Sequence, residues 1–193
     1  MSEDPGKQMV ESLAMTRRLF GQISKLIQAA DSSLAEAGWE CSSTNKCTDL
    51  TGHVGRPKKW MPQNIYRIYN YNDAENTGLE KDISLFIGVL LDQDMSWQGF
   101  DEPWLTFGLF QFAPGHAKSW DEDWVKSPLE ARQEPNGTFF TWDIDSGDEG
   151  EEGFIYEAFA AIPLISIESM EDLKIRLIEP LLQEVESRLE RES

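Results

Sequence analysis

Five carboxylates stand in or just after predicted strands, where they could hold a divalent cation. They belong to the apolar runs at 82–92, 138–144 and 154–162, and they are Asp92, Asp94, Asp143, Asp145 and Glu157. Carboxylates that meet at a sheet edge are typical Mg²⁺ ligands in enzymes of phosphoryl or phosphodiester chemistry. A nuclease of this kind would also place a Lys two residues after a strand carboxylate, and neither Asp145 nor Glu157 is followed by one. A magnesium-dependent enzyme is therefore an alternative and not the favoured prediction.

The stretch from Thr141 to Phe159 contains seven carboxylates and no Lys or Arg. Its start resembles a calcium loop, but an EF-hand requires Gly at position six and Glu at position twelve. Counting from Asp143 or from Asp145, position twelve is Phe154 or Tyr156. We therefore expect an acidic hairpin tip and no cofactor, with Mg²⁺ or Ca²⁺ as the alternative.

Two cysteines and two histidines could supply zinc ligands or a nucleophile with its base. The spacing of Cys41, Cys47 and His53 lacks the tight cysteine pair of most structural zinc sites, and His116 is distant. Neither cysteine lies in a recognisable strand-to-helix turn, as a nucleophile would. We interpret both as reduced thiols, and the sequence leaves open whether they are bridged.

Aromatic and acidic residues alternate between residues 97 and 124, and this pattern is the best indication of a binding surface. Tryptophan near carboxylates suits the recognition of a basic or extended peptide, because the indole face attracts cations. The predicted partner-binding residues are Trp97, Trp104, Trp120, Asp121, Asp123 and Trp124.

Charge is unevenly distributed along the 193 residues, whose net charge is −18. Residues 1–81 carry ten bases and ten acids, whereas residues 82–173 carry three bases and twenty acids. Such a field repels nucleic acid and anionic membranes and attracts basic partners. No apolar run reaches the roughly 18 residues of a membrane span, and the N-terminus does not resemble a signal peptide. We therefore expect a cytoplasmic protein.

The elements that must position these residues follow from hydrophobic periodicity. Three- and four-residue spacing predicts a helix over 8–37, which ends at Gly38, after a frayed segment 1–7. The residues at 41–63 read as a long irregular loop. Ser169 and Asp172 form a plausible capping box for an amphipathic helix over 170–191, which Pro180 should kink or divide at Glu179.

Five strands are predicted between these helices, at 64–71, 82–92, 103–112, 138–144 and 154–162. Two of them are apolar on both faces and belong in the middle of a sheet. The links between the second and third strands, and between the fourth and fifth, are short, which favours antiparallel pairing of these neighbours. The chain is therefore predicted to be one α+β domain over 1–193, with an N-terminal and a C-terminal helix packed on a mostly antiparallel sheet.

These observations favour a non-catalytic cytoplasmic protein that docks a basic protein partner on an acidic, Trp-rich face. The magnesium-dependent enzyme is one alternative. An acidic mimic of nucleic acid is another, since the charge fits, but it would need acids spaced like phosphates. The sequence leaves the partner and the oligomeric state open.

Overall fold

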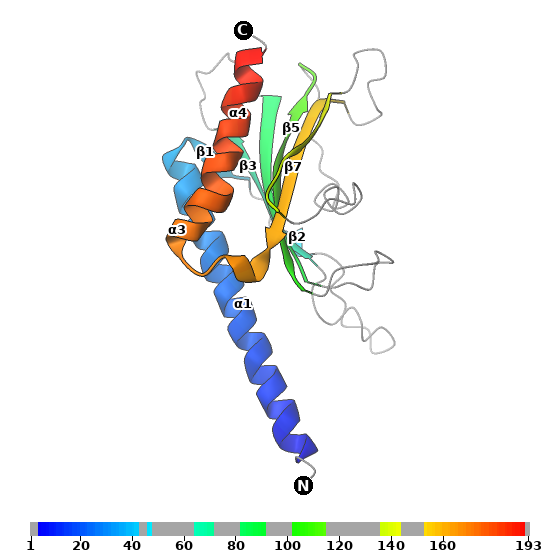
Figure 1. Ribbon diagram of the computed structural model, residues 1–193, viewed down its shortest axis with the longest axis vertical. Coiled ribbons are helices and arrows are strands. Elements are labelled where there is room, and N and C mark those ends of the chain that lie inside the picture. Colours follow the sequence, from blue (N-terminus) through cyan, green and yellow to red (C-terminus); the bar gives the residue numbers. More distant parts are fainter. Residues whose placement is uncertain are drawn as a thin grey trace.

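The computed structural model describes residues 4–42, 46–47, 64–71, 82–91, 102–114, 136–143 and 153–191. It confirms an α+β arrangement in which an antiparallel sheet stands between an N-terminal and a C-terminal helix in the sequence. Figure 1 shows both helical segments on the same side of the sheet. None of the helices in the described part of the chain has the length and apolar composition that a bilayer span requires.

The sheet has the strand order β1-β3-β4-β5-β7-β6, and the short β2 also pairs with β3. Its strands are β1 (Trp39–Cys41), β2 (Lys46–Cys47), β3 (Asn64–Tyr71), β4 (Ile83–Leu90), β5 (Trp104–Phe112), β6 (Phe140–Asp143) and β7 (Phe154–Pro163). All five predicted strands are present, but the count of five is wrong, because β1 is a sixth strand in this order and β2, inside the predicted loop 41–63, is a seventh strand of the sheet. Three residues are too few to show the alternation that reveals a strand in a sequence.

Both faces of the central strands are buried, as their apolar patterns predict. On the helix face, Ile83, Leu85, Ile87 and Val89 are at most 1% exposed and share one core with both helical segments. On the second face, a separate cluster contains Tyr66, Ile68, Phe86, Phe110, Phe112 and Phe159. Between β5 and β7 the backbones approach closely at Gly108, where an added Cβ would lie 2.2 Å from the carbonyl oxygen of Ala158.

The N-terminal helix α1 (Pro5–Glu36) begins three residues earlier than predicted. Asp4 caps it by accepting a hydrogen bond from the backbone amide of Gly6, and Pro5 occupies the first turn, where a missing N–H costs nothing. Gly38 follows with φ +87°, which confirms the predicted left-handed stop. The C-terminal half of α1 packs on the sheet, and the N-terminal half extends beyond it (Figure 1).

The C-terminal segment runs through η4 (Leu164–Ser166), α3 (Met170–Leu173), the π-helical η5 (Lys174–Ile178) and α4 (Glu179–Arg191). The predicted capping box is confirmed, because Ser169 Oγ accepts from the amide of Asp172 at 3.0 Å and donates to its carboxylate at 2.7 Å. Proline removes an intrahelical hydrogen bond and crowds the carbonyl four residues earlier. The π-helical turn ends just before Pro180, and the predicted division at Glu179 is the point where regular α-helix resumes.

Candidate functional site

The strand β6 is the last in the sheet order, and it pairs with β7 through the register Trp142↔Glu157 and Asp143↔Tyr156. Because side chains alternate along a strand, Trp142 and Asp143 lie on opposite faces of the sheet. The indole of Trp142 is 59% exposed. It is therefore a large aromatic side chain presented to solvent on the last strand of the sheet, as far as the structure describes the chain.

Asp143 lies on the helix face, where an arginine from α4 contacts three strands. Arg188 Nη1 donates to Asp143 Oδ1 at 3.2 Å, and Nε donates to the buried Gln111 at 2.6 Å. The guanidinium also lies over the ring of Tyr156, 4.4 Å from its centroid. The Tyr156 hydroxyl donates to Glu184 at 2.5 Å. Burial, and then this bond to a carboxylate, raises the pKa of Tyr156 above its usual value.

Trp142 lies on the second face, where aromatic packing supports the edge strand. Phe140, two residues earlier on the same face, stacks on Phe159 of β7 with 5.2 Å between ring centroids. Glu157 is the direct cross-strand neighbour of Trp142 and also pairs with Phe110 of β5. Directly opposite residues of an antiparallel pair have side chains in contact range. The exposed indole therefore stands beside a carboxylate and above a packed aromatic layer.

The structure does not bring together the two metal-ligand candidates that it describes. Asp143 and Glu157 point to opposite faces, since Asp143 is opposite Tyr156 whereas Glu157 is opposite Trp142. Asp143 instead forms a salt bridge with Arg188. Within the described ranges, no three His, Cys, Asp or Glu side chains gather around a common point. Asp92, Asp94 and Asp145 lie outside the described residues.

Of the six predicted partner-binding residues, the structure describes only Trp104. Its ring is 3% exposed and packs with Leu90 and Ala161, so it offers little surface to a partner. Trp97, Trp120, Asp121, Asp123 and Trp124 lie outside the described residues. Sequence reasoning missed Trp142, although the residue lies in a predicted strand next to the acidic stretch. Its exposure depends on which strand forms the edge, and no sequence pattern states that.

Cys41 belongs to a polar cluster between α1 and the sheet. Arg67 Nη2 donates to Asp31 Oδ2 at 2.8 Å, Tyr69 donates to Asp31 Oδ1 at 2.9 Å, and Arg67 Nη1 lies 3.3 Å from Cys41 Sγ. Burial raises the pKa of the Cys41 thiol more than the neighbouring Arg67 lowers it. A thiol with a raised pKa is a poor nucleophile at neutral pH. The cluster therefore ties α1 to β3, while His53 and His116 lie outside the described residues.

Comparisons of the chain with protein-family models, with curated proteins and with solved structures found no match.

Proposed function

We propose that this chain is a non-catalytic, cytoplasmic binding protein that docks a basic protein partner, and that the β6 edge forms part of its docking surface. The observation that carries the proposal is the 59% exposed Trp142 at the end of the sheet order, opposite Glu157 and next to Asp143. An exposed tryptophan beside carboxylates is the kind of anchor that hot spots of interfaces use.

The chemistry of this edge suits an extended, cationic segment. A strand at the end of a sheet can pair its outward backbone groups with an incoming peptide, and side-chain positions then provide specificity. A Lys or Arg of that peptide on the second face would meet the indole of Trp142 and the carboxylate of Glu157. The net charge of −18 would speed the encounter and make it sensitive to salt.

The Trp-bearing stretch predicted from the sequence remains a separate part of this proposal. Trp97, Trp120 and Trp124, with Asp121 and Asp123, would extend the acidic docking surface. The magnesium-dependent alternative receives no support from the described carboxylates, because Asp143 would first have to leave Arg188. A protein that mimics nucleic acid would require acidic side chains spaced like phosphates on one face. The prominent exposed side chain of the β6 edge is instead the aromatic Trp142.

The proposal is tested by titrating the protein into a fluorescently labelled, extended Arg-rich peptide and following its anisotropy. Trp142→Ala is expected to weaken binding about tenfold or more, because a buried aromatic anchor contributes on the order of 2 kcal/mol. Trp142→Phe should retain part of the affinity. Thr141→Ala is the matched control, since Thr141 is the preceding exposed residue of β6 and points to the other face.

Two further peptides separate the parts of the mechanism. A peptide with Glu in place of Arg should not bind, because it meets a field of its own sign. A peptide with methylated backbone nitrogens should bind more weakly, because it cannot add to the edge strand. Equal affinity of the parent protein and Trp142→Ala for the Arg-rich peptide would refute the β6 edge as the docking surface.

A further inference from the structure

The helix α1 has one largely apolar face along its length, and the sheet covers only the C-terminal half of that face. Two series of residues, each spaced seven apart, form this face. The first is Met9, Thr16, Ile23 and Ala30, and the second is Leu13, Phe20, Ile27 and Leu34. Such a repeat keeps side chains on one face of a helix. Ile23, Ile27, Ala30 and Leu34 are buried against the sheet, whereas Met9 is 68% and Leu13 54% exposed. The uncovered part, which we name the α1 stripe, consists of the exposed Met9 and Leu13 and of the half-buried Thr16 and Phe20 at its border, where Phe20 packs against the core.

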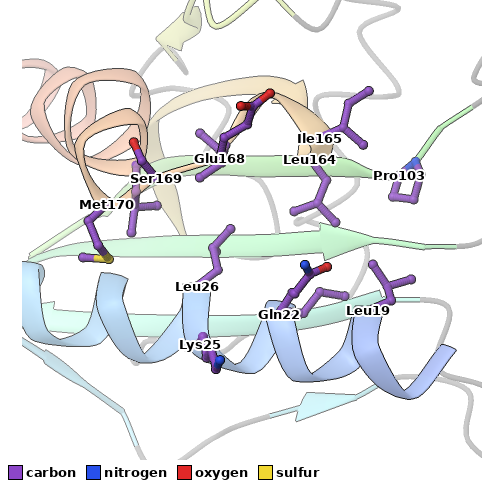
Figure 2. Close-up of a pocket in the computed structure, with 13 residues that line it drawn as sticks. Leu19, Gln22, Lys25, Leu26, Pro103, Leu164, Ile165, Glu168, Ser169 and Met170 are labelled. Atoms are coloured by element: carbon purple, nitrogen blue, oxygen red, sulfur yellow. The ribbon is translucent and has the colours of Figure 1, made fainter. Parts of the chain in front are cut away.

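A groove of 680 Å³ lies beside the covered half of the same helix. Leu19 and Leu26 of α1 form one wall, and the opposite wall includes Leu164, Ile165 and Met170 (Figure 2). Ile165 is 69% and Met170 58% exposed. Large apolar side chains that line a concave surface and remain in water indicate a site that another surface covers. We name this site the α1 groove.

We propose that two copies of this chain associate by inserting the α1 stripe of each copy into the α1 groove of the other. The stripe cannot reach its own groove, because α1 is one continuous helix from Pro5 to Glu36 and its N-terminal half leads away from the sheet (Figure 1). The stripe and the groove belong to the same chain, so one two-fold rotation can place each stripe on the groove of the other copy. Such a self-complementary interface closes at the dimer.

Charge complementarity favours a second copy as the occupant of the groove. Residues 5–20 contain Lys7, Arg17 and Arg18 against Glu11, a net charge of +2, so the rest of a chain with −18 carries −20. Glu168 and Lys25 line the groove, and Glu171 and Asp172 with Lys174 and Arg176 follow in the sequence, so the charges near the groove balance and the acidity is that of the molecule as a whole. In the dimer, the basic N-terminal half of α1 would therefore contact a predominantly acidic partner copy. This attraction offsets part of the repulsion between two acidic copies.

Sedimentation velocity of the full chain over a range of concentrations tests this proposal. The parent protein is expected to form dimers. Leu13→Glu should weaken the association about tenfold or more and leave the protein monomeric at concentrations near the dissociation constant of the parent dimer, because it places a charge in an apolar interface. Gln28→Glu is the matched control, since it adds the same charge to an exposed position of α1 outside the stripe and should leave the dimer unchanged. Circular dichroism checks that each variant is folded.

A mixing experiment then tests whether the stripe contacts the groove. Met170→Glu should also abolish the dimer, and an acid in the first turn of α3 does not oppose the helix dipole. Leu13→Glu retains an intact groove and Met170→Glu an intact stripe. An equal mixture of the two folded variants should therefore recover association through one of the two contacts, although each variant alone is monomeric.

Several results would overturn the proposal. A parent protein that stays monomeric at every concentration excludes the dimer, and a dimer unaffected by Leu13→Glu excludes the stripe. A dimer that depends on Leu13 but not on Met170 would indicate pairing of two stripes instead of insertion into the groove. The β6 edge takes no part in this contact, so binding of the Arg-rich peptide by monomeric Leu13→Glu tests the proposed function separately.

Discussion

Arg188 lies with its guanidinium 4.4 Å from the centroid of the Tyr156 ring, and the same group donates hydrogen bonds to Gln111 and Asp143. One side chain of α4 therefore contacts β5, β6 and β7. Its side chain is only 12% exposed, so solvent screens these interactions less than those of a surface pair. The C-terminal helix and the edge strand that carries Trp142 are connected through this arginine.

Replacement of Arg188 should destabilise the protein measurably. Arg188→Ala removes a charge-assisted hydrogen bond and a cation–π contact, and we expect the free energy of unfolding to fall by about 2 kcal/mol. Urea denaturation followed by circular dichroism measures this loss. Arg188→Lys keeps the charge but not the planar fork, so it should recover only part of the stability. Arg191→Ala, at an exposed position of the same helix, should have little effect, and equal losses for the two alanine variants would contradict the assigned contacts.

Stability should fall at alkaline pH because of buried tyrosines. Burial, and then the nearby carboxylate of Asp31, raises the pKa of Tyr69 far above its ordinary value of about 10. Above that pH the unfolded chain loses the phenolic proton while the folded protein keeps it, so the folded state binds more protons. The free energy of unfolding then decreases by up to about 1.4 kcal/mol per pH unit for each such tyrosine.

Urea denaturation of the parent protein and of Tyr69→Phe, at pH values from neutral to above 10, checks this expectation. Tyr69→Phe loses the hydrogen bond to Asp31, so it should be less stable near neutral pH. Its stability should nevertheless decline less steeply as the pH rises above about 10. Parallel curves for the two proteins over the alkaline range would show that Tyr69 is not responsible for the decline.

Two glycine-to-alanine changes should have opposite effects on stability. At Gly108 an added Cβ would lie 2.2 Å from the carbonyl oxygen of Ala158 and 2.9 Å from the Cα of Phe159, so β5 and β7 would have to separate. Gly108→Ala should therefore prevent cooperative folding. At Gly21, in α1, a Cβ would meet nothing within 4 Å. Gly21→Ala should stabilise the protein by up to about 1 kcal/mol, the difference in helix propensity. Thermal unfolding measures both changes, and a stable Gly108→Ala protein would contradict the close approach of the two strands.

Patterns within short segments predicted most of the secondary structure. The caps at Ser169 and Gly38 were predictable because their partners lie within a few residues of the same chain. The two-sided apolar runs of β4 and β5 likewise predicted central strands that are buried on both faces. The three-residue β1 could not be predicted in this way, since its pairing with β3 decides that it is a strand.

The candidate surfaces required tertiary information. Trp104 and Trp142 are both tryptophans in predicted strands, and the first is buried and the second exposed because β5 is central and β6 lies at the end of the strand order. Asp143 and Glu157 are both ligand candidates in the magnesium-dependent alternative, but the register of β6 on β7 assigns them to opposite faces. Strand order and register depend on contacts between residues distant in the sequence, which local patterns do not encode.

The sequence by itself determined the two helical segments, five of the strands, the stop at Gly38, the cap at Ser169 and which positions share an apolar face. These properties depend on backbone preferences and on side-chain spacing within a few residues. Only the tertiary structure decided that the sheet covers the C-terminal half of the apolar face of α1 and leaves Leu13 in solvent, and that Trp142 lies on the last strand of the sheet order. Exposure is a relation between elements packed in three dimensions, so a repeat that extends from Met9 to Leu34, with Thr16 as its polar member, cannot show which of its residues the sheet covers.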